Sequence, residues 1–299
     1  MPRRPPRRVV AAITAVLLAL AGAVWGVTHL LGRNTPFLID PRCEATANDV
    51  TIRLAVDQTE NAALIAQIAE RRDLPARAVT IALATALQES KLRNIDYGDR
   101  DSLGLFQQRP SQGWGTEEQV MDPIYASKKF YSALVKVPNY LNLPITEAAQ
   151  AVQRSAFPDA YAQHEDIARA FASALTGHSP RGLTCILREP AAPGDPQALI
   201  KALQKQLGKD KVNAEILTPV PPSSADMDDG GPPVIALIAP DERLAWSLAA
   251  WAVGHASAFE VVRVQVGGDV WDRQAGAWGD AGEEDSPAGA LEVLVTLSD

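Results

Sequence analysis

The chain has 299 residues, and its 46% hydrophobic and 21% charged content is ordinary for a globular protein with some membrane-length sequence. The length exceeds one average domain, which favours two modest domains and an anchor. The formal net charge is −8 although the first eight residues hold four arginines, so the rest of the chain is strongly acidic. An acidic surface repels phosphate backbones, and nucleic acid is therefore not expected as a partner.

The N-terminus predicts a membrane anchor. Residues 1–8 form a basic tail, and the uncharged residues 9–31 would span about 34 Å as a helix, more than a bilayer core of roughly 30 Å. Because the arginines precede this run, the positive-inside rule places the tail in the cytoplasm. The expected localisation is the cell membrane, single-pass, with bilayer contact through residues 9–31 and the C-terminal domains extracytoplasmic. A signal peptide cleaved near Ala19-Leu20-Ala21 is the alternative, and it also exports the chain.

Cys43 and Cys185 are the only two cysteines. In an oxidising compartment they are expected to form a disulfide that closes the segment between them. Two independent buried thiols are the alternative. Neither cysteine lies in a CxxC pair or near paired histidines, so no metal site is expected.

Helical spacing of apolar residues dominates the segment between the cysteines. Helices are predicted over 59–72, 76–91, 123–136, 146–155 and 160–175. The second of these is apolar nearly all round from Val79 to Leu87, which places it at a domain centre. No strand-like alternation appears between residues 55 and 177, so residues 43–185 are expected to form a mainly α domain.

A second, smaller domain is predicted beyond a proline-rich linker at 186–196. Residues 197–299 are expected to form an α+β accessory domain, with helices at 196–207 and 240–256 and strands at 213–218, 233–239, 259–266 and 291–297. Trp271 and Trp278 flank a hairpin-like stretch, and this pair either packs on a small sheet or grips a sugar or a partner. The predicted fold class is thus an N-terminal transmembrane helix, a mainly α domain and a small C-terminal α+β domain.

Glu89 ends the most apolar helix and precedes a polar loop. A carboxyl beside an apolar core loses hydration, and the negative end of a helix dipole further disfavours its ionised form. A carboxyl that keeps its proton near neutral pH can act as a general acid on a glycosidic oxygen. The alternative is an exposed glutamate at a helix end, with no chemical role.

A second motif lies fifteen residues after Glu89, where Gly104-Leu105-Phe106-Gln107 begins. Together with Glu89-Ser90, it resembles the lytic transglycosylase and goose-type lysozyme superfamily, whose pattern is Glu-Ser, a loop with a serine, and then Gly-Leu-Met-Gln at this spacing. The resemblance covers about residues 55–180. It implies a lysozyme-like domain in which Glu89 is the catalytic acid and residues 104–107 line the sugar site.

The third motif of that superfamily, Ala-Tyr-Asn-x-Gly, is poorly matched. Its nearest counterpart, residues 151–155, has Val152 in place of the tyrosine and Gln153 in place of the asparagine. Tyr161, from the following helix, is a candidate to supply the missing ring. Trp114 offers a stacking ring, although packing in a core explains it equally well, and Gln108 offers an amide. The residues expected at the sugar site are Ser90, Ser102, Gly104, Leu105, Phe106, Gln107, Gln108, Trp114 and Tyr161.

The function expected from the resemblance is cleavage of the β-1,4 bond between N-acetylmuramic acid and N-acetylglucosamine in peptidoglycan, with no cofactor. A hydrolase needs a second carboxylate, which Asp96, Asp99 or Asp101 could supply, whereas a lytic transglycosylase does not. The alternative is a glycan-binding or assembly module on the same fold, without turnover, which Val152 favours. A cell-wall protein is the expected partner of the C-terminal domain.

Overall fold

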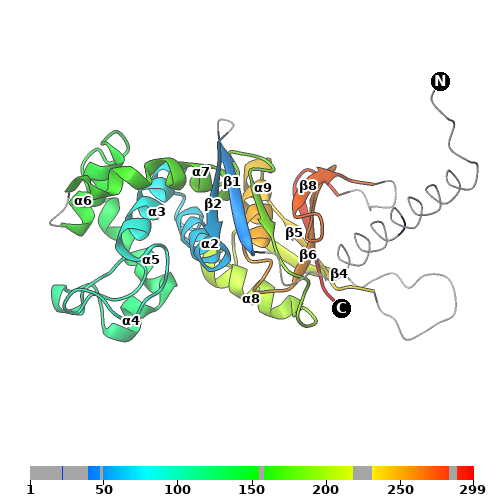
Figure 1. The fold of residues 1–299 in the computed structure, drawn as a ribbon, viewed down its shortest axis with the longest axis horizontal. Helices are drawn as coiled ribbons and strands as arrows, with labels where there is room; N and C mark the ends of the chain where they lie inside the picture. Colours follow the sequence, from blue (N-terminus) through cyan, green and yellow to red (C-terminus); the bar gives the residue numbers. More distant parts are fainter. Residues whose placement is uncertain (1–21, 23–39, 48–49, 155–157, 218–230, 283–287) are drawn as a thin grey trace, which may run out of the picture. The chain divides into compact units, whose positions relative to one another are not determined.

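The computed structural model describes residues 22, 40–47, 50–154, 158–217, 231–282 and 288–299 of the chain. Residues 41–299 belong to one compact unit. Figure 1 labels most of its helices and several of its strands. Its elements are β1 Arg42–Ala47, β2 Val50–Ala55, α2 Val56–Glu70, α3 Ala76–Ser90, the 3-10 helix η2 Pro110–Gln112, α4 Glu117–Met121, α5 Pro123–Leu134, α6 Ile145–Gln153, the 3-10 helix η3 Pro158–His164, α7 Glu165–Leu175, β3 Leu183–Ile186, α8 Pro196–Leu207, β4 Asn213–Leu217, β5 Val234–Ile238, α9 Glu242–Gly254, β6 Val261–Val266, β7 Asp269–Asp272, β8 Ala277–Asp280 and β9 Glu292–Leu297.

The predicted helices of the first segment are confirmed, with ends that shift by a few residues. Helix α3 is the central one, because residues 78–87 are all buried and the helix contacts α2, α5, α6 and α7. Helix α5 begins at Pro123, where the Asp122 side chain accepts hydrogen bonds from the backbone N–H groups of Ile124 and Tyr125. An aspartate before a first-turn proline is a strong helix start, which explains why this boundary was predicted correctly. Only the helix expected at 160–175 differs, since its first turn is the 3-10 helix η3.

The predicted fold class is wrong. The described residues form a mixed α/β structure with eight α-helices and two antiparallel sheets, not a mainly α domain followed by a small α+β domain. The sheet that was missed has the order β2-β1-β3 and brackets the helices in sequence. Its strands are rich in alanine, arginine and threonine, of which only threonine favours strands, and β1 pairs with β3 across more than 130 residues. Local sequence patterns therefore carried no signal for it.

Apart from residue 22, the predicted transmembrane helix at residues 9–31 lies outside the described residues. Among the residues that the structure describes, no helix is both long and apolar enough to cross a bilayer. The predicted membrane anchor, its bilayer contact and the single-pass localisation are corrected on this finding, because the structure supports none of them.

The second sheet contains six strands in the order β4-β5-β9-β6-β7-β8, all antiparallel. The predicted hairpin is confirmed, because Trp271 of β7 pairs with Trp278 of β8. Helix α9 lies between the two sheets in Figure 1, and it contacts β3 on one side and β5, β6 and β9 on the other. Residues 244–254 of this helix are all buried, as its uninterrupted apolar sequence requires.

Buried polar contacts attach α9 to the helices of the first segment. The Gln67 side-chain amide donates to the Ser247 hydroxyl at 3.0 Å, and that hydroxyl donates to the Leu175 carbonyl at 2.7 Å. The Arg243 guanidinium makes a two-pronged ion pair with Glu70 at 2.7 and 2.9 Å. Bidentate pairs of this kind fix geometry as well as charge. The two segments that the sequence suggested as separate domains thus share a buried boundary; the division itself stays a prediction.

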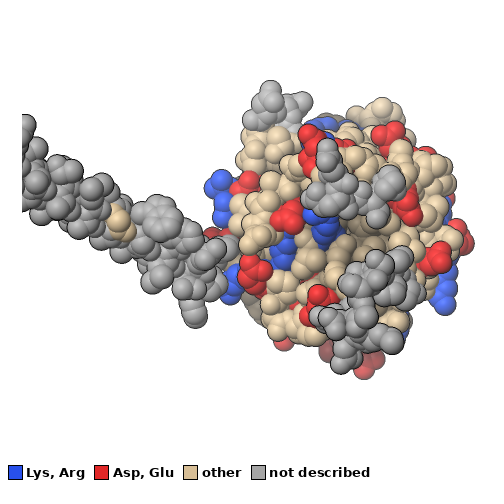
Figure 2. Space-filling view, turned by 90° about the vertical axis from the view of Figure 1, so that its right-hand side faces the viewer, with Lys and Arg blue, Asp and Glu red and all other residues tan. Residues whose placement is uncertain are grey.

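The surface beside the six-stranded sheet carries charges of both signs. Figure 2 shows acidic and basic side chains interspersed over the described part of this face. Interspersed charges of this kind produce no strong local field of one sign.

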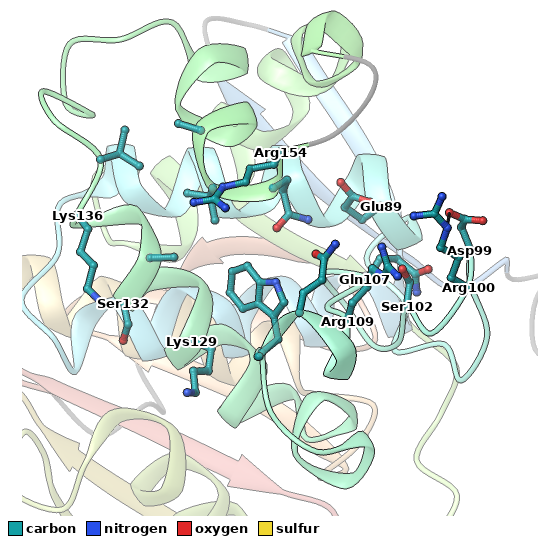
Figure 3. A pocket seen from close by; sticks show the side chains of 18 of the residues that line it. Glu89, Asp99, Arg100, Ser102, Gln107, Arg109, Lys129, Ser132, Lys136 and Arg154 are labelled. Carbon is teal, nitrogen blue, oxygen red and sulfur yellow. Dashed lines mark ion pairs between the residues drawn. The ribbon is translucent and has the colours of Figure 1, made fainter.

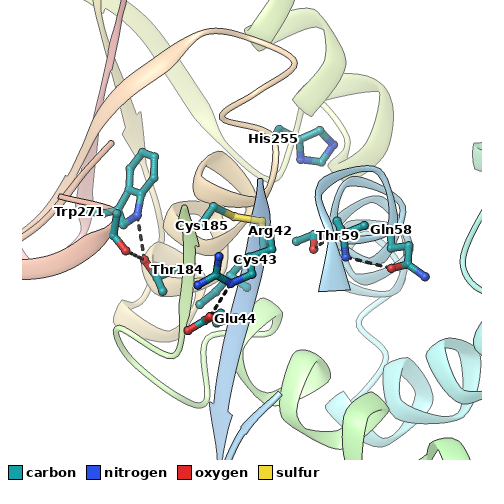
Figure 4. The surroundings of a disulfide bond; sticks show 12 residues. Arg42, Cys43, Glu44, Gln58, Thr59, Thr184, Cys185, His255 and Trp271 are labelled. Atoms are coloured by element: carbon teal, nitrogen blue, oxygen red, sulfur yellow. Dashed lines mark hydrogen bonds and ion pairs between the residues drawn. A yellow bond between two sulfur atoms is a disulfide. The ribbon is translucent and has the colours of Figure 1, made fainter. Parts of the chain in front are cut away.

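The predicted disulfide is confirmed. Cys43 of β1 and Cys185 of β3 are directly paired in the ladder, with their Cα atoms 3.9 Å apart and both side chains buried (Figure 4). On the far side of β3, the Trp271 indole donates to the Thr184 hydroxyl at 3.0 Å. The disulfide therefore joins β1 and β3 of the three-stranded sheet beside the point where Trp271 of the six-stranded sheet bonds to β3.

Loss of the disulfide is expected to destabilise the protein strongly. Closing a loop of 142 residues restricts the unfolded chain, which corresponds to about 2–5 kcal/mol of unfolding free energy. Urea unfolding of the full-length protein should show this loss both after reduction and in the variant with Cys43→Ser and Cys185→Ser. Reductant should leave the double variant unchanged, and an unchanged midpoint for reduced wild type would contradict the prediction.

His255, at the end of α9, makes stability depend on pH. Burial lowers its pKa to about 4 from the ordinary 6.5, although the bond from Nδ1–H to the Trp251 carbonyl acts in the opposite direction. The unfolded chain therefore binds a proton at a higher pH than the folded one, so stability is full above pH 6.5 and falls as the pH drops towards 4. Between about pH 7 and pH 4.5, wild type should lose on the order of 2–3 kcal/mol more than His255→Phe in urea unfolding. Parallel curves for the two proteins would refute this.

Candidate active site

Glu89 lies in the last turn of α3, on the wall of a cavity. The chain leaves the helix through Lys91 and Leu92, which both have left-handed backbone angles, with φ of 56° and 58°. The N–H of Leu92 donates to the carbonyl of Ala86 at 3.0 Å, and the Leu92 side chain is fully buried. Such a terminus is well anchored, so the half-buried Glu89 is held at a fixed point.

Tyr161 bonds directly to Glu89. Its hydroxyl donates to Oε1 of the glutamate at 2.7 Å, and its ring is fully buried. The two residues are 72 positions apart, and the 3-10 helix η3 brings the tyrosine back over the end of α3. Because the ring is packed, the hydroxyl holds the carboxyl in one orientation.

Residues 104–107 form a tight turn that reaches the same cavity. Leu103 and Gln108, on either side of the turn, exchange two backbone hydrogen bonds of 3.0 and 3.1 Å. Gly104 has a φ of 75°, and a Cβ atom there would lie 2.4 Å from the Val120 carbonyl. Both the backbone angle and the close approach require glycine at this position.

Two side chains fasten this turn to the helices around it. The Ser90 hydroxyl donates to the Leu105 carbonyl at 2.7 Å, and the Gln153 amide donates to the Phe106 carbonyl at 2.8 Å. Ser90 directly follows Glu89 in the last turn of α3, so the same helix end positions both the 104–107 turn and the Glu89 carboxyl. Gln153 stands where the resembled superfamily has asparagine, and in this structure it is a support of the turn.

The cavity has a volume of about 1330 Å³ and runs past Glu89 and the turn (Figure 3). Its volume exceeds the range of roughly 300–1,000 Å³ that is typical of small-molecule pockets, so it has room for a larger ligand. Its walls come from α3, the loop that follows, α5 and α6. The lining residues are Glu89, Asp99, Arg100, Ser102, Gln107, Arg109, Gln112, Gly113, Trp114, Lys129, Ser132, Ala133, Lys136, Val137, Pro138, Ala151, Val152, Gln153 and Arg154.

The residues that the sequence assigned to the site fall into two groups. Those that line the cavity are Glu89, Ser102, Gln107 and Trp114. Those that lie behind the cavity wall are Ser90, Gly104, Leu105, Phe106, Gln108 and Tyr161. Phe106 is fully buried and stacks on Phe130 at 4.6 Å, so it packs the core beneath the turn. Gln108 is 1% exposed and donates to the Ala126 carbonyl, which keeps its amide away from a ligand.

Only one of the three loop aspartates lines the cavity. Asp99 does so, although 90% of its side chain is exposed, while Asp96 lies outside the wall. Asp101 accepts the backbone N–H of Ser111 at 2.8 Å and pairs with Arg109 at 2.8 Å. The hydrogen bonds from Ser111, followed by the one from Arg109, hold the pKa of Asp101 well below its usual range. Asp101 is therefore a structural anion that ties two loops together.

Cations form much of the wall, and sequence reasoning missed all of them. They are Arg100, Arg109, Lys129, Lys136 and Arg154. Arg109 is held by Asp101, and Arg100 lies 3.9 Å from Asp99. No local motif marks Lys129 or Lys136, because their position depends on how α5 packs beside the turn. Arg154 lies within residues 151–155, the poorly matched third motif, which was the one available signal.

The bond between Ser90 and Leu105 yields a prediction about stability. Ser90→Ala leaves a buried carbonyl without this donor, and we expect a loss of about 1–3 kcal/mol in urea unfolding. Ser127→Ala is the matched control, because Ser127 is also buried but donates only to the Pro123 carbonyl within its own helix. Its loss should stay below about 1 kcal/mol. Equal losses in the two variants would show that the contact with the turn contributes nothing.

The geometry of the cavity is the basis for assigning a function. No family model matches the chain, and no curated protein matches it. The resemblance noted in the sequence therefore has to be judged on the contacts of Glu89, Ser90, Gln153 and Tyr161.

Proposed function

We propose that the protein cleaves the β-1,4 bond between N-acetylmuramic acid and N-acetylglucosamine in peptidoglycan, with Glu89 as the general acid. The observation that carries the proposal is the hydrogen bond from the Tyr161 hydroxyl to Oε1 of Glu89, on the wall of a cavity of about 1330 Å³. The motif spacing supports it independently, because Ser90 and residues 104–107 are in direct contact.

The tyrosine contact supports one of the two carboxyl oxygens as the donor. Tyr161 donates to Oε1, which leaves Oε2 as the oxygen that would carry the proton in the proposed acid. No described group hydrogen-bonds to Oε2. A proton on that atom is free to pass to the leaving glycosidic oxygen as the bond from C1 breaks, which is the task of the acid in glycoside cleavage.

The arrangement of carboxylates favours a lytic transglycosylase over a hydrolase. A hydrolase needs a second carboxylate to position or activate water. Asp101 is engaged with Ser111 and Arg109, and Asp99 is almost fully exposed beside Arg100. We therefore propose that the C6 hydroxyl of the muramic acid attacks C1 and returns its proton to Glu89, which leaves a 1,6-anhydro end and regenerates the acid.

The competing function is a glycan-binding module without turnover. Val152 favours it, because this residue occupies the place of the motif tyrosine and lies on the cavity wall. Tyr161 weakens that argument, since it supplies a phenol to the same carboxyl from η3. The two functions differ in whether any bond is cut, so a turnover measurement separates them.

Substitution of Glu89 tests the proposal. Glu89→Gln keeps the shape of the side chain and removes the transferable proton, so release of soluble fragments from purified peptidoglycan should fall by about 10²–10⁴-fold. Tyr161→Phe keeps the ring and removes one hydrogen bond, and its activity should fall by roughly 10-fold. Mass spectrometry should find products lighter by one water than those of a hydrolase.

Each of the other outcomes has a definite meaning. Equal release by wild type and Glu89→Gln, with matching unfolding curves, would show that Glu89 is not the acid. Products with reducing ends would replace the transglycosylase by a hydrolase. No release by wild type from any wall preparation, together with binding to the same material, would establish the binding module.

A further inference from the structure

Three cations on the cavity wall form a group, which we call the basic wall. Lys129 lies in α5, Lys136 lies two residues beyond that helix, and Arg154 directly follows α6. In Figure 3, Lys129 and Lys136 lie at the end of the cavity away from Glu89 and Asp99, and Arg154 lies between the two ends in this view. The basic wall is thus separate from the acid.

No ion-pair partner of the basic wall is found among the residues that the structure describes. Within the described part of the chain, none of its three members forms an ion pair, whereas the other cavity arginines pair with Asp99 and Asp101. This is notable in a chain with a formal charge of −8, in which acidic side chains are abundant. The Lys129 ammonium lies 5.3 Å from the centroid of the Tyr125 ring, a contact that leaves its charge in place. Cations without a neutralising carboxylate on a concave wall create a local positive potential in an otherwise acidic protein.

The chemistry of these side chains indicates the kind of group they would bind. Lysine presents a mobile point charge, and arginine presents a planar fork that fits a carboxylate or a phosphate. A neutral sugar could accept hydrogen bonds from these side chains, as it could from Gln107, but it offers no negative charge to match their three positive charges. The spare charge therefore points to an oxyanion carried by the ligand.

We propose that the basic wall binds an anionic substituent of the glycan strand, so that the cavity selects acidic β-1,4-linked amino sugars over neutral ones. This inference rests on the proposed function, because it assumes that a glycan strand occupies the cavity. The oxyanion has three candidate sources, which are the lactyl carboxylate of muramic acid, a carboxylate of an attached peptide and a phosphate on the sugar. The binding test below distinguishes them.

The test measures equilibrium binding to full-length Glu89→Gln, so that no substrate is consumed. The probes are a neutral N-acetylglucosamine oligomer, glycan strands freed of peptide that keep the lactyl carboxylate, the same strands with peptides attached, and strands with phosphate on the muramic acid. The variant combines Lys129→Gln, Lys136→Gln and Arg154→Gln. Lys128→Gln is the matched control, because Lys128 neighbours Lys129 on α5 but does not line the cavity.

We expect the triple variant to bind its best anionic probe roughly 10-fold or more weakly than the parent, because three charge contacts are lost. Binding of the neutral oligomer should change by less than about 2-fold, and added salt should weaken only the anionic probes. The control should match the parent on every probe. Whichever anionic probe loses the most affinity identifies the source of the anion.

Failure of this inference differs from failure of the proposed function. If the parent binds neutral and anionic glycans equally and the triple variant changes neither, the basic wall has no such role while the glycan site stands. If the parent binds no probe at all, both proposals are overturned. Unfolding curves for the triple variant exclude a folding defect, and equal loss of neutral and anionic binding in a folded variant would also overturn the inference.

Discussion

The attachment of β3 is the constraint on which the remaining structure depends. One edge of this strand pairs with β1 and is locked there by the bond between Cys43 and Cys185. Near its other edge, the indoles of Trp271 and Trp278 donate to Thr184 and to the Leu183 carbonyl at 3.0 and 2.7 Å. Strand β3, which has only four residues, therefore contacts both sheets, and α9 packs against it.

The packing that supports the Glu89 cavity can be followed outward from β3 and α9. Helix α9 packs on α2 and α7, and these two helices contact α3, which ends at Glu89. The 3-10 helix η3, directly before α7, carries the tyrosine that holds the glutamate. The Glu89 carboxyl is thus positioned by packed helices, and its hydrogen bond comes from Tyr161, whose place depends on tertiary packing. Residues held in this way keep their geometry when a ligand enters.

Local patterns in the sequence predicted most elements but not their assembly. Apolar periodicity and proline starts located α2, α3, α5, α8 and α9, because these signals act over a few residues. The sheet β2-β1-β3 was missed, since pairing between β1 and β3 depends on residues that are far apart in sequence. Within the site, the resemblance identified Glu89 and residues 104–107. Tyr161 was a candidate ring from the sequence, but the sequence did not predict its contact with Glu89. The cations of the cavity wall could not be predicted, because their grouping exists only once α5 and α6 have packed.

The pairing of β1 with β3 also has a consequence for biosynthesis. The N-terminal strand is made long before its partner, so Cys43 emerges as a free thiol and one edge of β1 stays open while the helices are translated. Open edges and free thiols are both sites of association between chains. With only two cysteines in the chain, the sole incorrect disulfide is one that joins two molecules. A disulfide between the Cys43 thiols of two chains would therefore compete with the native bond until β3 and Cys185 have been made.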